Sequence, residues 1–230
     1  MLCLRLPRLL LAALLRAVPT LASAGVRPWI SGAIGGSTYA MGDVNDEVGA
    51  INSALAGTGL SMDEVTTGLN FGLAFGLDVG SGFAVGLGYD HLSARTEVGD
   101  YSGSIEYDLP ANLLRGFGRY SFESAGKVTG FLEASLGRVT SAGSITVSAT
   151  GYGSQSGDID GSGVAFEGAG GMSIWATPQF AFTGMAGFRR AEVGEVEVDG
   201  MPAYDVSGGD YTIDYSGLFV RLGITVALAQ

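Results

Sequence analysis

The sequence predicts an all-β protein, an eight-stranded, antiparallel, up-and-down β-barrel that spans a membrane. Between Val65 and Tyr89, large apolar residues alternate with glycine, alanine and asparagine, which is the two-residue period of a β-strand. The large-residue face carries no charge, and the opposite face is small and polar. Similar segments recur along the chain, separated by glycine-rich or acidic stretches. This pattern is typical of strands with one face toward lipid and the other toward a narrow interior.

Residues 1–24 have the features of a secretory signal peptide. Arg5 and Arg8 make its start basic, an apolar stretch follows, and Ala22-Ser23-Ala24 is a small-residue cleavage site. The apolar stretch is shorter than the ~20 residues that a membrane-spanning helix needs. Because Arg16 interrupts that stretch, a short cytoplasmic extension before a later start codon is the alternative. The one cysteine lies in this segment, so the mature chain is expected to have neither disulfides nor thiol chemistry.

Residues 25–230 show no compositional break and are expected to form one barrel domain. Strands are expected near 29–40, 65–78, 83–90, 109–122, 128–139, 164–175, 180–190 and 211–228, and 145–149 is expected to extend them beyond the membrane. Short turns and long loops alternate, so the turns should share the periplasmic end and the loops the extracellular end. In the first long loop Asn45 is expected to cap a short helix, and Pro110 is expected to mark a bulge.

Acidic residues concentrate in the long loops. The chain has 23 acidic and 12 basic residues, and 18 of the acids fall in the four predicted extracellular loops, with Arg95 as their single base. This net negative charge argues against a nucleic-acid partner. Asp158, Asp160 and the acidic cluster at 43–47 offer oxygen ligands of the kind that calcium prefers. Neither group has EF-hand spacing, so solvated acidic loops are favoured, and neither a metal nor another cofactor is expected.

Seven charged residues have the inward-facing parity of the predicted strands. Charges inside a narrow barrel need partners, because an unpaired buried charge is costly to desolvate. We therefore predict a lumenal ion-pair network formed by Asp90, Arg115, Arg119, Glu133, Glu167, Arg189 and Arg221. An eight-stranded barrel is just wide enough for side chains to fill its interior, so a plugged lumen is expected rather than an open pore.

Other side chains are expected to mark the two membrane interfaces. Arg138 and Arg190 have outward parity near the outer rim, where they either snorkel or contact lipopolysaccharide phosphates. Aromatic residues are expected to form two interfacial girdles. The inner girdle is predicted to contain Trp29, Phe83, Phe122 and Phe180, and the outer girdle Tyr39, Tyr89, Tyr107 and Tyr211.

The last strand carries the most specific motif, Arg221-Leu222-Gly223-Ile224-Thr225-Val226-Ala227-Leu228. With this motif the mature chain resembles the small eight-stranded outer-membrane barrels of Gram-negative bacteria, the OmpA/OmpX/OmpW-like group. The resemblance implies a bacterial outer-membrane location and contact with the lipid and lipopolysaccharide of that membrane. It also implies that the barrel-insertion machinery recognises Arg221, Gly223, Val226 and Leu228, although Leu228 stands where the family usually has an aromatic residue. We expect a monomer.

The function expected from these features is that of a non-enzymatic, porin-like protein of the cell envelope, whose plugged barrel and acidic loops serve envelope integrity or surface interaction. A narrow channel for small or apolar solutes is one alternative. A lipid A-modifying enzyme is another, because His91, Ser93 and Glu97 resemble the His/Ser pair plus acid with which some outer-membrane barrels attack an ester. No sequence suggesting an oxyanion hole follows Ser93. A soluble lipocalin-like binder is the third alternative, and the uncharged outward faces argue against it.

Overall fold

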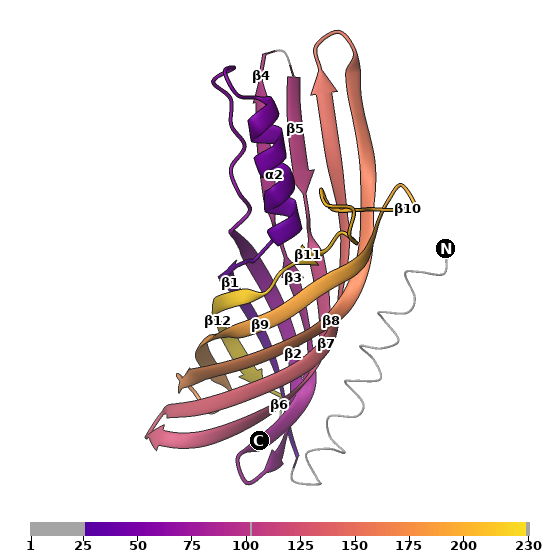
Figure 1. Ribbon diagram of the computed structural model, residues 1–230. Helices are drawn as coiled ribbons and strands as arrows, with labels where there is room; N and C mark the ends of the chain where they lie inside the picture. Colours follow the sequence, from indigo (N-terminus) through magenta and orange to yellow (C-terminus); the bar gives the residue numbers. More distant parts are fainter. Residues whose placement is uncertain (1–25, 102, 229–230) are drawn as a thin grey trace, which may run out of the picture.

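Eight antiparallel strands pair in a closed ring in the computed structural model, which describes residues 26–101 and 103–228 (Figure 1). In ring order these strands are β1 (Arg27–Thr38), β2 (Thr67–Gly80), β3 (Phe83–Leu92), β6 (Ala111–Ala125), β7 (Val128–Ala149), β8 (Gly153–Trp175), β9 (Phe180–Val198) and β12 (Gly217–Ala227). The ring closes because β12 pairs with β1, from Trp29 with Ala227 to Ser37 with Phe219. The predicted eight-stranded, up-and-down barrel is confirmed. The predicted signal peptide lies outside the described residues.

The connections between strands differ at the two ends of the barrel. At one end, short turns join β2 to β3, β6 to β7 and β8 to β9. At the other end, the chain makes long excursions that contain α2 (Gly42–Ala54), β4 (Arg95–Asp100), β5 (Gly103–Asp108), β10 (Met201–Pro202) and β11 (Ile213–Asp214). This is the expected division between periplasmic turns and extracellular loops.

On one side of the barrel the strands continue well beyond the ring. β7 and β8 pair along their whole length, from Val128 with Ile174 to Ala149 with Gly153. The outer part of β7 also pairs with β5, which in turn pairs with β4. Figure 1 shows these strands rising as a tall wall beside α2. We call β4, β5 and the outer parts of β7 and β8 the outer wall.

Pro110 lies in the break between two strands. The bulge that was expected at this proline is therefore replaced by an interruption between strands. β5 ends at Asp108 and β6 begins at Ala111. The neighbouring strand on one side differs before and after this break, because β5 pairs with β4 whereas β6 pairs with β3. Proline has no amide hydrogen to donate to a neighbouring strand, and its carbonyl accepts a hydrogen bond from the hydroxyl of Ser141. The proline therefore separates barrel from wall.

A hydrophobic core fills the extracellular half of the molecule. Val44 and Val48 of α2 are completely buried in one cluster with Leu92, Val193 and Tyr215, residues of β3, of β9 and of the segment before β12. We call this cluster of buried apolar residues the outer core. It packs the helix against the inside of the wall and the mouth of the ring, so the first long loop folds inward as a plug.

The helix in the first loop forms as predicted, but Asn45 does not cap it. The N-cap is Met41, with left-handed backbone angles and no capping side chain. The Asn45 amide instead binds the backbone of Val65, donating to its carbonyl at 3.3 Å and accepting from its N–H at 2.8 Å. Asn52 binds both backbone groups of Met62 in the same way, at 3.0 and 2.7 Å. Two asparagines thus fasten the helix to the segment that leads into β2.

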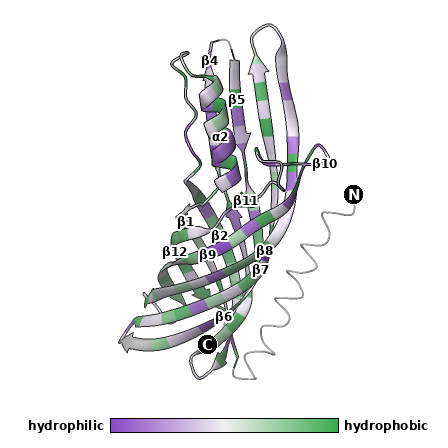
Figure 2. Cartoon of the chain, viewed as in Figure 1, coloured by the Kyte–Doolittle hydropathy of each residue, from purple (hydrophilic) through white to green (hydrophobic). Residues whose placement is uncertain are grey.

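The outer surface of the ring is apolar. Residues with outward parity are exposed and large, among them Ile34, Leu69, Phe71, Leu73, Leu87, Leu114, Leu132, Leu136, Phe166, Phe182, Phe188, Val220 and Leu222. Figure 2 shows apolar positions recurring along the barrel strands. An apolar belt that encircles a closed ring exceeds the patches that soluble monomers expose, and it is the surface with which a transmembrane barrel meets lipid. No helix in the described part of the chain is long and apolar enough to cross a membrane.

The two aromatic girdles are only partly as predicted. Phe83 and Phe122 are exposed at the inner end, where Tyr120 lies between them with ring centroids 4.9 and 6.5 Å away. Tyr89 is exposed at 40% and Phe180 is half-buried.

Four residues assigned to the girdles point inward or pack within the outer excursions. Trp29, Tyr39 and Tyr107 are each at most 5% exposed, and Tyr211 is partly buried beside α2. Trp29 and Tyr39 point inward because the odd-numbered residues of β1, and Tyr39 directly after it, face the lumen. Tyr107 and Tyr211 pack against the outer core.

Candidate functional site

The lumen at mid-height holds seven charged side chains. They come from six neighbouring or facing strands, and each is at most 8% exposed: Asp90 on β3, Arg115 and Arg119 on β6, Glu133 on β7, Glu167 on β8, Arg189 on β9 and Arg221 on β12. These are the seven residues of the predicted lumenal network, and the structure brings all of them together. Strand alternation explains this, because every one of them has the parity that faces the interior.

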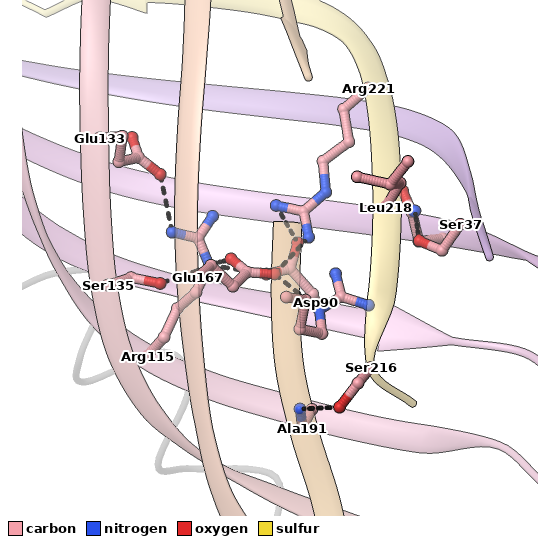
Figure 3. Close-up of polar contacts among 12 residues, drawn as sticks. Ser37, Asp90, Arg115, Glu133, Ser135, Glu167, Ala191, Ser216, Leu218 and Arg221 are labelled. Atoms are coloured by element: carbon pink, nitrogen blue, oxygen red, sulfur yellow. Dashed lines mark hydrogen bonds and ion pairs between the residues drawn. The ribbon is translucent and has the colours of Figure 1, made fainter. Parts of the chain in front are cut away.

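Glu167 is the centre of the network (Figure 3). Its Oε1 accepts from Nε of Arg189 at 2.7 Å and from Nη2 of Arg221 at 2.9 Å. Its Oε2 lies 3.1 Å from Nε of Arg115. One carboxylate is therefore shared by three guanidinium groups.

The other two carboxylates extend the network to either side. Arg115 donates from Nε to Oδ2 of Asp90 at 2.7 Å and from Nη1 to Oε1 of Glu133 at 2.9 Å. Asp90 also lies 3.3 Å from Nη1 of Arg221. Glu133 is bound by Arg119 through its other oxygen. Buried charges are tolerated only when they are paired and hydrogen-bonded, and a continuous chain of bonds achieves that here.

Aromatic rings pack against the guanidinium groups of Arg119 and Arg221. The guanidinium carbon of Arg119 lies 4.6 Å from the ring centroid of Trp29 and 4.2 Å from that of Phe131. Arg221 lies 4.3 Å from the ring of Phe219. Such cation–π contacts are strongest where water is excluded. The sequence analysis missed Trp29, Phe131 and Phe219 as members of the site. For Phe131 and Phe219 a usable signal was present, because they share the inward parity of Glu133 and Arg221 on the same strands.

The two ends of the lumen differ. At the extracellular end, the outer core seals it, with Tyr215 donating to the carbonyl of Leu109 at 3.0 Å and lying edge-to-face against Tyr39 at 5.5 Å. At the periplasmic end, a cavity of about 810 Å³ opens to the outside. Its lining includes Trp29, Asp78 and Arg119, and the indole N–H of Trp29 donates to Asp78 at 3.2 Å. The cavity lies on the inner side of the network, so it is a vestibule.

His91 and Ser93 form hydrogen bonds with different partners. Nδ1 of His91 lies 3.0 Å from the side-chain oxygen of Asn112, which also accepts from the hydroxyl of Tyr89 at 2.6 Å. The Ser93 hydroxyl donates to the backbone carbonyl of Leu69 at 3.3 Å. A serine whose hydroxyl donates to a carbonyl is not activated by the histidine, because the base must accept that same proton.

Glu97 and the acidic loop residues have other partners. Glu97 forms an exposed ion pair with Arg95 at 2.9 Å. Asp43 accepts from both the N–H and the hydroxyl of Thr212 at 2.7 Å, and Glu47 accepts from the hydroxyl of Tyr211 at 3.1 Å. Within residues 26–101 and 103–228, no three acidic, histidine or cysteine side chains cluster as a metal site would require.

The remaining predicted residues lie on the outer surface of the barrel and along the seam between β12 and β1. Arg138 and Arg190 are exposed on β7 and β9, on either side of β8, and Arg138 donates to the hydroxyl of Ser162 at 3.1 Å. Of the assembly-signal residues, Gly223 and Val226 lie in the seam between β12 and β1, opposite Ala33 and Ile30. Leu228 follows β12 and its N–H donates to the carbonyl of Pro28 at 2.8 Å.

Comparison with known proteins yields structural likeness without sequence likeness. No protein-family model and no curated protein matches the sequence. Among solved structures, the chain is similar to Neisserial surface protein A (NspA), with 13% identity, 87% of this chain and 96% of that chain covered, and a TM-score of 0.46. It is similar to Ail, the attachment invasion locus protein of Yersinia pestis, with 12% identity, 88% and 98% coverage and a TM-score of 0.44. It is also similar to the outer membrane protein OprG from Pseudomonas aeruginosa, with 12% identity, 89% and 95% coverage and a TM-score of 0.41.

The molecule's own geometry determines what kind of protein it is. The ring is closed, its outer face is apolar, and its long connections all lie at one end. A closed ring leaves no backbone group unpaired in hydrocarbon, and the short turns and long loops lie as they do in outer-membrane barrels. The chain therefore folds as an eight-stranded transmembrane β-barrel.

Proposed function

We propose that this protein is a non-enzymatic, non-conducting barrel of the outer membrane that supports the envelope and presents its outer wall and acidic loops to the cell exterior. The observation that carries the proposal is the double closure of the lumen. The ion-pair network crosses it at mid-height, and the outer core with α2 fills the extracellular half. A solute would have to displace both layers to pass.

The extracellular half offers the surface for interaction. Eighteen of the 23 acidic residues lie in segments beyond the ring, so this half is strongly negative. Such a field attracts cations and basic partners and repels acidic ones. The barrel anchors this surface in the membrane, in which it is expected to function as a monomer.

Two exposed arginines are proposed to contact lipopolysaccharide. Arg138 and Arg190 project outward at the extracellular edge of the apolar belt, opposite Val164 and Phe166 of β8 in the strand register. Arginine binds phosphate groups bidentately, and the phosphates of lipid A lie at this height of the outer leaflet. Assembly through the insertion machinery, with the final strand as its signal, is part of the same proposal.

Conductance measurements test the closed lumen directly. The purified barrel is inserted into planar bilayers in 1 M KCl, roughly the strength at which even small pores are resolved, beside an established porin as positive control. The expected record is flat for this protein and stepwise for the porin. Discrete, reproducible conductance steps from this barrel would overturn the proposal and favour the narrow-channel alternative.

A second measurement separates a structural role from lipid A chemistry. Outer membranes from cells expressing the wild type, His91→Ala or Ser93→Ala are compared by mass spectrometry of their lipid A. We expect three identical acylation profiles. If the wild type alters the acylation of lipid A relative to cells without the protein, and either variant does not, the barrel is an enzyme.

The contribution of the outer wall is tested in cells that lack the protein. Complementation with the full barrel is compared with a variant in which residues 145–157 of the β7–β8 hairpin are replaced by a short turn. If both proteins restore resistance to detergents, the barrel itself supports the envelope. If only the shortened variant loses surface binding, the outer wall is the interaction surface. Failure of the full barrel to restore either property would refute the proposed role.

A further inference from the structure

Several buried polar atoms have no partner on the extracellular side of the ion-pair network. Within the described residues, Nη1 and Nη2 of Arg189, Nε of Arg221 and the hydroxyl of Tyr39 are buried and make no hydrogen bond. Arg189 is 1%, Arg221 2% and Tyr39 5% exposed. The side-chain oxygen of Asn70 is also unpaired, although its amide nitrogen donates to Ser37 at 2.7 Å. Nearly all of these atoms are hydrogen-bond donors.

The charges around these donors do not balance. Four arginines are buried in the network and only three carboxylates. Among residues 26–101 and 103–228, Arg189 pairs only with Glu167, and Glu167 also binds Arg115 and Arg221. A further acid, Asp78, is exposed at the periplasmic vestibule, which Arg119 also lines, at the opposite end of the network. The surplus of positive charge therefore lies on the side of Arg189.

The unpaired groups share one neighbourhood. The guanidinium carbons of Arg189 and Arg221 lie 5.4 and 4.3 Å from the ring centroid of Phe219. Across the seam, Ser37 pairs with Phe219 and Gly35 with Arg221. Tyr39 is the next buried residue of the same inward parity, so it lies at the extracellular side of these arginines. A ring face satisfies part of a guanidinium charge but accepts none of its in-plane hydrogen bonds.

We propose that a monovalent anion of halide size binds between Arg189, Arg221 and Tyr39. Such an ion accepts several N–H and O–H hydrogen bonds at once and cancels one buried positive charge. A divalent anion would replace the surplus positive charge by a negative one, which is equally costly to bury. Because the network lies on one side and the outer core on the other, the ion is expected to enter while the barrel folds.

Refolding with different anions tests the site. The full mature chain is refolded from urea into detergent with sodium bromide or sodium gluconate at equal ionic strength, and the temperature of unfolding is read from the gel-mobility shift. Bromide is a compact monovalent ion, whereas gluconate is a much larger one that the proposed site should exclude. The expected midpoint is higher in bromide by roughly 5 to 10 °C, the shift that a hundredfold ligand excess gives a protein of this size. Equal midpoints would overturn the proposal.

Variants separate a specific site from a general salt effect. Arg189→Met makes the buried charges equal in number and should abolish the bromide shift, whereas Arg138→Met removes an exposed arginine and should keep it. Tyr39→Phe removes one donor without changing charge and should reduce the shift, which keeps the test decisive if Arg189→Met does not fold. A shift of full size in both Arg189→Met and Tyr39→Phe would show that the ion does not bind there.

Anomalous diffraction from crystals of the protein refolded in bromide locates the ion. The expected peak lies within hydrogen-bonding distance of the Arg189 terminal nitrogens and the Tyr39 hydroxyl. Bromide peaks confined to the protein surface would represent an adventitious ion only, and they would refute the site.

Discussion

Arg119 and Glu133 face each other directly across the β6–β7 pair, and two nitrogens of Arg119 donate to the same oxygen of Glu133. The distances from Nε and Nη2 to Oε2 are 2.9 and 2.7 Å. The pair lies at the boundary between the network and the periplasmic vestibule, where Arg119 is also enclosed by Trp29 and Phe131. The innermost ion pair of the lumen is therefore fixed by strand register and by aromatic packing together.

The stability losses caused by substituting Arg119 and Glu133 are expected to be coupled. Arg119→Met leaves Glu133 with only Arg115, and Glu133→Gln leaves Arg119 buried without a countercharge. Each single variant should lose on the order of 3 kcal/mol of unfolding free energy. The double variant should lose less than the sum by ~1 kcal/mol or more, measured from urea unfolding followed by tryptophan fluorescence.

The exposed pair Arg95 and Glu97 supplies the control. Their side chains are 56% and 63% exposed, so the same cycle with Arg95→Met and Glu97→Gln should give nearly additive losses, because solvent screens an exposed ion pair. Additive losses at Arg119 and Glu133 would mean that these two charges do not stabilise one another.

Closure of the ring depends on Gly35. A Cβ at this position would collide with the backbone carbonyl of Val220 on the facing strand β12, whereas the nearest atom to a Cβ at Gly36 is 3.8 Å away. Gly35→Val should therefore prevent pairing of β1 with β12, and the compact form on unboiled gels should be lost. Gly36→Val should still migrate as the compact form and shift on boiling. Equal behaviour of the two variants would contradict the register of the seam.

Much of the ring and of its charged interior could be predicted because a two-residue period leaves little choice. Once Leu73 faces lipid, Asn70 and Asp90 must face the lumen, and the same logic places the arginines of β6 and the glutamates of β7 and β8. In a strand that otherwise contains glycine and aliphatic residues, a charged residue shows which of the two faces points toward the lumen. The network therefore followed from alternation and from the cost of an unpaired charge.

The parts that could not be predicted lack that periodic contrast. β1 contains mostly small residues, so nothing indicated that Trp29 faces inward and Tyr39 continues on the same side. The outer core joins α2 to β9 and to the segment before β12, and such contacts between distant excursions have no local pattern. Asn45 looked like a helix cap because asparagine favours that position, but its amide fits the unpaired backbone of Val65 equally well.

The two asparagines of α2 are expected to hold the plug in place. Asn45→Ala and Asn52→Ala each leave two partly buried backbone groups of the facing segment unpaired, at a cost of about 1 to 3 kcal/mol. Hydrogen exchange should accelerate in α2 and in residues 61–66 while the membrane strands keep their protection. Asn112→Ala, which alters an outward-facing asparagine, is the matched control and should leave α2 unchanged. Protection of α2 that survives the double variant would show that apolar packing alone holds the helix.

Alkaline pH is expected to loosen the same plug. Burial, followed by the nearby Glu47 carboxylate, raises the pKa of Tyr211 and of Tyr107 above the usual tyrosine value. Both hydroxyls therefore bind their protons more tightly in the folded state than in the unfolded state. Their contribution to stability is fully present below pH ~10 and is lost as the pH rises through the folded-state pKa values.

The measurement is phenolate absorbance at 295 nm, recorded together with hydrogen exchange in α2. In the wild type, part of the signal from the nine tyrosines should appear only above pH ~10 and together with faster exchange in the helix. Tyr211→Phe should reduce that delayed fraction, while Tyr152→Phe, at a 94% exposed residue, should reduce only the early one. Because deprotonation at either buried tyrosine would place a second negative charge beside Glu47, the helix is expected to detach rather than to accommodate it. Simultaneous titration of all tyrosines with no change in exchange would contradict this coupling.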